Sequence, residues 1–463
     1  MDYNENLNIL LSEVITSNHK FERKMEQIYL PIITNQNSKF ENGFKTIVAN
    51  SVRIFNHKKI TEEYSNEKLI HKIINNDNFS YDKNDKKYLE ALIKSFLINE
   101  NNELNIIHPY FYMYVPEVTN KQRSNELQIG QFISDLFYSD VEGIGDYFDF
   151  KDDDKTELYY KNNILTDLVF KNLIVLPENT SSSNYVLKLN YVKKVFKEDI
   201  EFVIENNEEF LTSNLEELLA YYYFYYITQL TFKLYNKNNN LNKIEPLYYL
   251  TSNENISSNR KTINSGYSLI KNNNFYDIVT KILVISYLNK LLGTKGLVYS
   301  EIIEKIENMS NEEYNDFIYV LKEFIKIYVD LNPRLNLNED FLNENNYIQI
   351  IDYMFECFND PFYNAANNRY FKAIENLGKL YFLKRKGRYG YVLNISDNLL
   401  LAITALCIKE EKIKLKQLFK EYELRGLFFD KKSKKEIENL LTKLNLIDKK
   451  SDSGDAQYVR RIL

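Results

Sequence analysis

The hydrophobic positions of the last seventy residues predict a helix, a short strand and a second helix in close succession. Residues 398–409 form an apolar run typical of a buried helix, and residues 412–415 have the pattern of a short extended segment. One helical face then repeats at the spacing i, i+3, i+4, i+7, through Leu415, Leu418, Phe419 and Tyr422. Gly426 tolerates a positive φ and is therefore expected to end this second helix.

A third helix is predicted to begin at Ser433, because Ser433 and Glu436 have the S-x-x-E spacing of a capping box. Its apolar face repeats at the same helical spacing, through Ile437, Leu440, Leu441 and Leu444. Residues 445–450 and 456–463 predict two strands, joined by a turn at 451–455 that is rich in Asp, Ser and Gly. This order of elements is that of a winged helix-turn-helix, whose third helix usually enters the DNA major groove.

The charge of this segment favours a polyanionic partner such as DNA. Residues 409–463 hold 15 lysines and arginines against 10 aspartates and glutamates, a net charge of +5, whereas the whole chain has −6. An acidic body with a basic tail indicates nucleic-acid contact at the tail. The expected DNA-binding residues lie off the apolar face of the third helix and beside the predicted wing: Lys434, Lys435, Asn439, Thr442, Lys443, Lys449, Lys450, Arg460 and Arg461. The alternative is a protein-binding module whose lysines form an ordinary solvated face.

A second basic element is predicted within residues 355–395. A helical pattern over residues 362–378 ends at Gly378 and precedes two extended runs that turn near Gly387. The expected hairpin carries four basic residues at its tip, which are Lys384, Arg385, Lys386 and Arg388. Such a cluster suits phosphate contacts, which contribute affinity without sequence information. The pattern fits a second winged unit and, equally, a basic surface turn.

Hydrophobic periodicity over the rest of the chain predicts a mainly α-helical protein with small β-hairpins. Only 12 Gly and 7 Pro interrupt the 463 residues, so long helices are favoured. The run at 215–235 is apolar or aromatic on nearly every side, which is typical of a helix buried at the centre of a domain. Its charged residues argue against a membrane span, and a nucleic-acid stacking platform is the less favoured alternative. The predicted units are an N-terminal helical region (1–125), a central helical domain (126–345), the 355–395 unit and a C-terminal winged helix (396–463).

No motif for catalysis, metal binding or cofactor binding stands out in the sequence. Residues 292–296 (LGTKG) lack the spacing of a phosphate-binding loop. Asp397, Glu410 and Lys412 have the order of a nuclease D…E-x-K motif, but the helical run between the two carboxylates argues against a shared metal ion. We therefore expect a chain without catalytic residues, metal or cofactor.

The other chemically reactive residue types have structural interpretations. The acidic run at 146–157 is expected to be a solvated loop, and Cys357 and Cys407 are expected to be small buried hydrophobes. No local metal-ligand spacing connects the four histidines, which are His19, His57, His71 and His108. The start of the chain lacks the pattern of a signal peptide, so we expect a cytoplasmic protein without membrane contact.

Three stretches of the chain resemble one protein family. The sequence of residues 422–463, above all SDSGDAQYVR (451–460), is similar to the end of DptG proteins, also called DndG. The stretches ELLAYYYFYYITQL (217–230) and KRKGRYGYVLNISDNLLLAITAL (384–406) are further points of similarity. The resemblance is strongest over residues 384–463, weaker over the aromatic stretch and faint before residue 120.

DptG proteins belong to DNA phosphorothioation-dependent restriction systems. The resemblance therefore implies a subunit of an anti-phage complex that acts on DNA lacking phosphorothioate marks. Its implied partners are DNA and other proteins of the restriction system, including an ATPase subunit. We expect such a subunit to be a non-catalytic adaptor that contacts DNA. The alternatives are an autonomous winged-helix transcription regulator and an enzyme with an unrecognised site.

Overall fold

The computed structural model shows a mainly helical protein, as the sequence predicts. The strands are few and short, and those of the described residues form two three-stranded sheets. The described residues are 2–32, 40, 43–60, 65–75, 82, 85–100, 102–118, 123–149, 164–171, 173, 175–180, 185–237, 240–252, 254–273, 277–359, 361–449 and 457–463.

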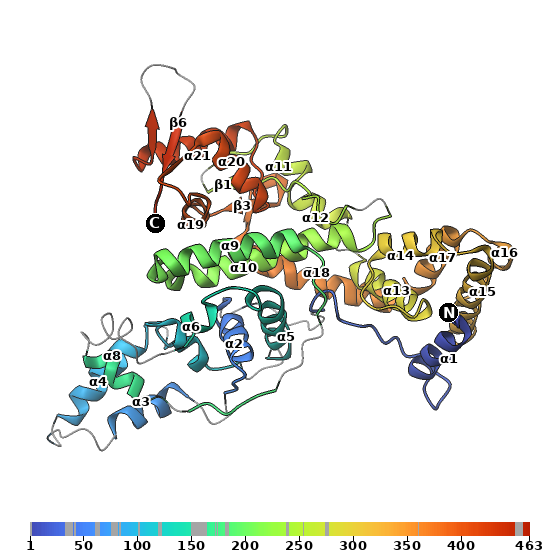
Figure 1. Cartoon of the computed structure of the whole chain (residues 1–463), viewed down its shortest axis with the longest axis horizontal. Helices are drawn as coiled ribbons and strands as arrows, with labels where there is room; N and C mark the ends of the chain where they lie inside the picture. Colours follow the sequence, from blue (N-terminus) through green and yellow to red (C-terminus); the bar gives the residue numbers. More distant parts are fainter. Residues whose placement is uncertain are drawn as a thin grey trace.

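Two long helices, α9 (Asn190–Asn206) and α10 (Glu208–Leu234), form the middle of the molecule (Figure 1). The C-terminal elements lie on one side of this pair, and the elements between residues 45 and 171 lie on the other side. Helices α13 to α17 form one end of the molecule. The N-terminal helix α1 (Tyr3–Val14) packs there, against α13 and α15. Helices α1 and α2, although consecutive in the chain, therefore lie far apart in the molecule.

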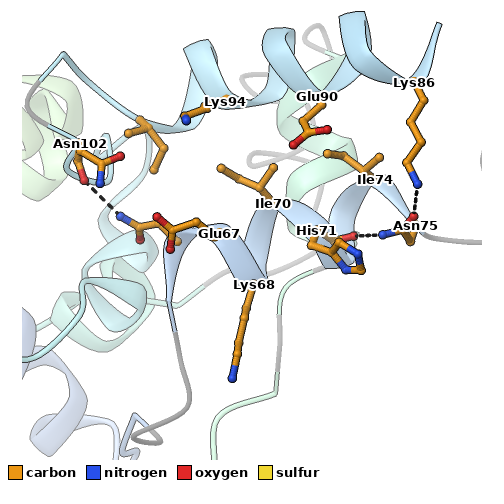
Figure 2. Close-up of a pocket in the computed structure, with 12 residues that line it drawn as sticks. Glu67, Lys68, Ile70, His71, Ile74, Asn75, Lys86, Glu90, Lys94 and Asn102 are labelled. Atoms are coloured by element: carbon orange, nitrogen blue, oxygen red, sulfur yellow. Dashed lines mark hydrogen bonds between the residues drawn. The ribbon is translucent and has the colours of Figure 1, made fainter. Parts of the chain in front are cut away.

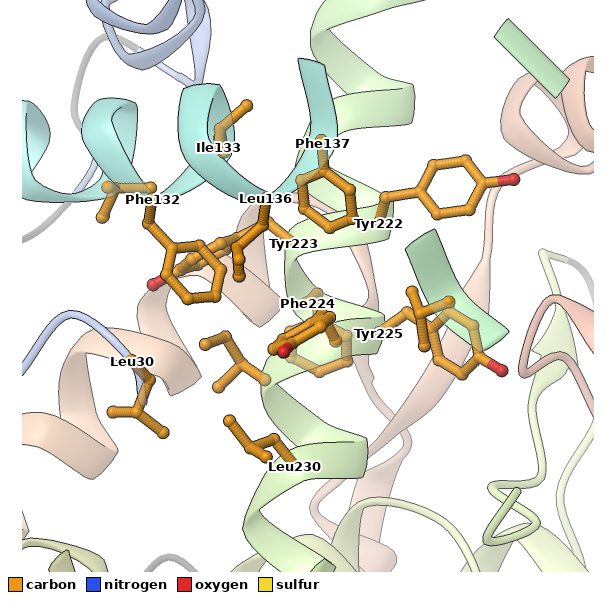
Figure 3. Packing of buried hydrophobic residues seen from close by; sticks show 14 of the residues in the cluster. Leu30, Phe132, Ile133, Leu136, Phe137, Tyr222, Tyr223, Phe224, Tyr225 and Leu230 are labelled. Carbon is orange, nitrogen blue, oxygen red and sulfur yellow. The ribbon is translucent and has the colours of Figure 1, made fainter. Parts of the chain in front are cut away.

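Helix α10 is the buried core helix that the aromatic pattern predicts. Every residue from Leu218 to Thr231 is buried. The ring of Phe132 packs edge-on against that of Tyr223, at a centroid distance of 5.8 Å (Figure 3). It packs in the same way against Tyr226, at 5.5 Å. This edge-to-face arrangement is one that aromatic pairs favour. Among the described residues, no helix is both long and apolar enough to cross a membrane.

The layer between residues 45 and 171 is built around the contact of α2 with α5. Gly130 of α5 permits this contact, because a β-carbon there would lie 2.7 Å from Cβ of Asn50. The buried guanidinium of Arg53 donates from α2 to the carbonyls of Met113 and Val115, which fixes the 3-10 helix η1. The elements of this layer are α2 (Lys45–Phe55), α3 (Asn66–Ile74), α4 (Lys86–Leu97), η1 (Pro109–Tyr114), α5 (Arg123–Ile133), the π-helical turn η2 (Ser134–Tyr138), α6 (Ile144–Tyr147) and α8 (Ile164–Lys171).

The helices that follow α10 extend from the C-terminal elements, beside which α11 lies, to the end of the molecule formed by α13 to α17. Helix α13 is buried on nearly all sides, because α1, α17 and α18 all pack against it. The elements are α11 (Lys261–Asn264), α12 (Tyr267–Asn273), α13 (Ile278–Leu291), α14 (Tyr299–Glu307), α15 (Asn311–Asp330), α16 (Glu339–Asn343), α17 (Tyr347–Phe358) and α18 (Pro361–Tyr381).

The first sheet contains the predicted hairpin near Gly387. Strand β2 (Leu383–Arg385) pairs antiparallel with β3 (Tyr391–Ile395), and β1 (Leu250–Thr251) pairs parallel with the other edge of β3. A 3-10 turn, η3 (Gly387–Tyr389), forms the tip. The expectation that the preceding helix ends at Gly378 is wrong, since α18 continues to Tyr381. Gly378 instead makes room for Leu383, whose Cδ1 would lie 2.8 Å from a β-carbon at that position.

Candidate nucleic-acid interface

The C-terminal module, residues 396–463, has the predicted order of helices and strands. Strand β6 lies between β4 and β5 and pairs antiparallel with both. Lys450 and the predicted turn at 451–455 lie outside the described residues. The elements are α19 (Asp397–Cys407), β4 (Lys412–Lys414), α20 (Leu415–Leu424), α21 (Lys431–Lys443), β5 (Ile447–Lys449) and β6 (Gln457–Arg460).

Helix α21 begins earlier than its capping-box pattern predicts. Asp430 is the N-cap residue, and its carboxylate accepts hydrogen bonds from the backbone N–H groups of Lys432 and Ser433. Ser433 is buried inside the first turn, where its hydroxyl accepts from Arg260 and donates to the carbonyl of Tyr249. The prediction of a cap at Ser433 is therefore wrong. Asp430 caps the helix instead, and the hydroxyl of Ser433 accepts a hydrogen bond from Arg260, which is distant in sequence.

The solvent-facing side of α21 is rich in lysine and in small polar side chains. The helix is held by its opposite side, where Ile437 and Leu441 are fully buried. Lys435 is well exposed and makes only a loose ion pair with Glu438, at 3.6 Å. The exposed side chains on this outer side are Lys431, Lys432, Lys435, Glu436, Asn439, Thr442 and Lys443. Four of the five predicted positions on this helix thus face solvent.

Lys434 and the two C-terminal arginines are held by other parts of the protein. Lys434 lies against α20, 3.3 Å from Glu423 and over the ring of Phe419. Arg460 is exposed but donates to Asp448 of β5, at 2.7 Å. Arg461 donates to Asn206 at the end of α9 and stacks over Phe202. These three side chains therefore stabilise the module and its attachment, and are less available to a ligand than Lys435 or Lys443.

The outer face of the second sheet carries two lysines that were not among the expected DNA-binding residues. The register places Lys412 opposite Arg460 and Lys414 opposite Tyr458, while Ile413 and the buried Val459 face the opposite side. Lys412 and Lys414 are both exposed. The alternation of lysine with apolar residues at 412–415 was the available signal, because side chains alternate between the two faces of a strand.

The basic hairpin of the first sheet lies beside the module. The ammonium group of Lys384 donates to the carbonyl of Ser252, and that of Lys386 donates to the carbonyl of Glu254. Partial burial, followed by the nearby charge of Lys384, lowers the pKa of Lys386. Arg385 and Arg388 are exposed, and Arg388 donates to the hydroxyl of Tyr389. The two arginines are therefore the hairpin cations best placed for an external anion.

A buried ion pair connects the module to the central helices. Arg425, just after α20, donates to both carboxylate oxygens of Asp199 on α9, at 2.7 and 2.5 Å. Tyr222 of α10 donates to the same carboxylate, at 2.5 Å. Burial alone would lower the pKa of Arg425, but the Asp199 carboxylate outweighs it and holds that pKa well above its ordinary value. The guanidinium therefore stays charged, and the buried Asp199 carboxylate accepts hydrogen bonds from both Arg425 and Tyr222.

Two other tyrosines of α10 satisfy the carbonyl groups at the end of α20. The hydroxyl of Tyr221 donates to the carbonyl of Arg425, at 2.6 Å, and that of Tyr225 donates to the carbonyl of Leu424, at 3.0 Å. Helix ends leave their last carbonyls without helical partners, so side-chain donors there stabilise the end. Gly426 follows with a φ of +80°, which confirms its predicted role as the helix terminator.

A cleft of about 530 Å³ lies between α3 and α4 (Figure 2). These two helices and the C-terminal module lie on opposite sides of the central helices (Figure 1). Ile70 and Ile74 contribute apolar surface to it. Hydrogen bonds close its two ends, from Lys86 to Asn75 and from the side chain of Asn66 to the carbonyl of Asn102. The rim mixes acidic and basic side chains, so the cleft does not define one class of ligand. The rim residues are Glu67, Glu90, Lys86 and Lys94.

The residues considered for catalysis are separated or buried. Asp397 is the first residue of α19 and Glu410 follows the other end of this helix, whose eleven residues span about 16 Å. His108 is buried and accepts a hydrogen bond from the backbone N–H of Tyr110, while burial lowers its pKa to about 4. In the described part of the chain, no three His, Cys, Asp or Glu side chains come together as a metal site. Residues 150–157 of the acidic run lie outside that part.

The two cysteines have the buried, structural character that the sequence predicts. Cys357 and Cys407 are free thiols in the core. Burial raises the pKa of Cys357 to about 11 and that of Cys407 to about 12, which keeps both protonated and poorly nucleophilic.

Neither the known protein-family models nor the curated proteins contain a match to this chain.

Proposed function

We propose that this chain is a DNA-contacting adaptor subunit of a phosphorothioation-dependent restriction complex. The observation that carries the proposal is the outer side of α21, where lysines, Asn439 and Thr442 face solvent on a helix anchored by its apolar side. Such a side chain set can bind phosphates and the edges of bases. In this proposal the module is a winged helix, and α21 is its recognition helix. The resemblance of residues 384–463 to DptG proteins supports the restriction system as the setting.

The adaptor part of the proposal rests on the charge and size of the remaining chain. Residues 1–408 carry a net charge of −11, which opposes DNA binding and suits contacts with other proteins. The catalytic work of the complex, ATP hydrolysis and DNA cleavage, is assigned in this proposal to partner subunits. The chain itself would position those partners on the DNA.

Binding of the full chain to duplex DNA tests the contact with DNA. We expect affinity to fall steeply with salt, because lysine–phosphate contacts release counterions. The double variant Lys435→Ala/Lys443→Ala should bind at least about tenfold more weakly at a salt concentration of about 0.1 M. The matched control is Lys72→Ala/Lys87→Ala, which removes two exposed lysines on α3 and α4 and should leave affinity unchanged. Absence of binding at low salt would overturn the proposal.

Co-expression with the proteins encoded beside its gene tests the adaptor role. We expect the chain to co-purify with an ATPase component as a stable complex that survives nuclease treatment. A solitary homodimer that occupies one operator and binds no neighbour would support an autonomous regulator instead. Metal-dependent cleavage of DNA by the isolated chain would show that the subunit is an enzyme.

A further inference from the structure

Two basic elements that are distant in sequence share one structural support. The β2–β3 hairpin and helix α21 are both attached to residues 250–260, which include strand β1 and the loop after it. Strand β1 pairs with β3 through Leu250 and Thr251, and α21 packs against the same strand. The backbone of Tyr249 also donates to the carbonyl of Phe428, just before α21.

Three polar interactions in series connect the hairpin to the first turn of α21. Lys386 donates to the carbonyl of Glu254, at 2.7 Å, and the Glu254 carboxylate accepts from Arg260, at 2.6 Å. Arg260 then donates to both oxygens of Asp430, the N-cap of α21, at 2.5 and 2.9 Å. The side chains of Arg260 and Glu254 are only 4% and 3% exposed. Loss of these interactions would therefore leave buried charges unpaired. The hairpin and α21 therefore have a fixed relative position.

The surface between the two elements is basic and polar. Arg385 and Arg388 are exposed on the hairpin, and Lys431 and Lys432 are exposed on the first turn of α21. The carboxylates of Glu254 and Asp430, which lie where the two elements join, are turned inward and paired with Arg260. The loop between them is exposed and has small hydrogen-bonding side chains, at Asn255, Ser257, Ser258 and Asn259.

We propose that the β2–β3 hairpin and α21 bind the same continuous DNA duplex, with Arg385 and Arg388 on phosphates beyond the end of the segment that α21 contacts. Three observations support this proposal: the shared support, the fixed separation and the inward pairing of Glu254 and Asp430 with Arg260, which leaves the exposed arginines and lysines facing solvent. The proposal rests on the proposed DNA contact of α21. It adds that the DNA interface has two parts, so full affinity requires a duplex longer than the segment that α21 alone would cover.

The test measures binding of the full chain to duplexes of about 10 and about 20 base pairs, one and two helical turns. We expect Arg385→Ala/Arg388→Ala to weaken binding of the longer duplex at least about tenfold at about 0.1 M salt. Its salt slope should become less steep by about 1.8, since each phosphate contact contributes about 0.9. Binding of the shorter duplex, which α21 alone can cover, should change little. Lys435→Ala/Lys443→Ala should weaken binding of both duplexes.

The outcomes separate this inference from the proposed function. Equal binding of the longer duplex by the wild type and the hairpin variant, with Lys435→Ala/Lys443→Ala weakened, would overturn the two-part interface and leave the α21 contact intact. Failure of the wild type to bind either duplex would overturn the proposed function itself. Thermal unfolding of each variant checks that the exposed arginines were removed without loss of the fold.

Discussion

Asp199 and Arg425, which are 226 positions apart in the chain, form a buried salt bridge with two hydrogen bonds. Asp199 is fully buried and the Arg425 side chain is 4% exposed. Arg425 also donates to the backbone carbonyl of Glu421, one turn earlier in α20. The pair therefore fixes the end of α20 on the central helices, at the point where the polypeptide turns toward α21.

Replacement of Arg425 by alanine should destabilise the protein strongly. We expect a loss of about 3 kcal/mol in the free energy of unfolding, because the buried Asp199 carboxylate would lose its two-point partner and keep only the partly exposed Lys409, at 3.6 Å. Chemical denaturation of the full chain measures the change. Lys435→Ala is the control, since it removes an exposed ion pair at 3.6 Å and should cost less than about 0.5 kcal/mol. Similar losses in the two variants would contradict the structural role of the buried pair.

Gly426→Ala should also be strongly destabilising. Gly426 has a φ of +80°, and a β-carbon there would overlap the ring of Tyr225. We expect a loss of about 2–4 kcal/mol from the combined backbone strain and steric overlap. Gly387→Ala provides a matched control, because Gly387 has a φ of +51° and no atom lies within 4 Å of the place that its new methyl group would take. That variant should lose only about 1 kcal/mol, and equal losses would exclude the ring contact as the cause.

The position of the α21 cap can be checked by a pair of alanine variants. Asp430→Ala removes the N-cap acceptor and the partner of Arg260, so we expect a loss of at least about 1–2 kcal/mol. Glu436→Ala removes the residue that the sequence pattern selects for a capping box, yet Glu436 is exposed and should cost less than about 0.5 kcal/mol. Urea denaturation measures both. A larger effect at Glu436 would restore the cap at Ser433.

His108 should make stability depend on pH between about 4 and 6.5. Burial lowers the pKa of folded His108 to about 4, from an ordinary value near 6.5. The unfolded chain therefore binds a proton in this range that the folded chain does not, and stability should fall as pH falls. Relative to His108→Asn, the wild type should lose about 3 kcal/mol between pH 6.5 and pH 4. Asparagine can still accept the hydrogen bond from Tyr110, and a difference that stays constant with pH would contradict the prediction.

Local sequence patterns predicted the helices and helix ends of this protein better than the tertiary contacts that their residues make. The aromatic stretch of α10 and the terminator Gly426 were identified correctly, because burial on all sides and a positive φ leave local signatures. Ser433 was misassigned because its decisive partner, Arg260, is 173 residues away. No sequence spacing could indicate that contact.

The candidate interface shows the same limit. Helical periodicity placed Lys434 and Lys435 together on the outer side of the third helix, but the position of α20 turns Lys434 into a partner of Glu423. Arg461 was assigned to DNA because it is basic and lies beside the predicted wing, and in the structure it lies against Phe202 and Asn206 of α9. Charge composition identifies a basic segment, whereas tertiary packing decides which of its side chains remain free to bind.

The tyrosine hydroxyls of α10 that cap α20 also have a consequence for the geometry of an assembled complex. Because Tyr221 and Tyr225 hold the end of α20, they restrict rotation of the module on the central helices. A duplex seated on α21 would then meet the acidic remainder of the chain at one angular position about the DNA axis. In the proposed complex, a partner protein bound to that remainder would therefore act on one face of the double helix. Lengthening the DNA between the segment bound by α21 and the partner's site by half a helical turn would place that site on the opposite face.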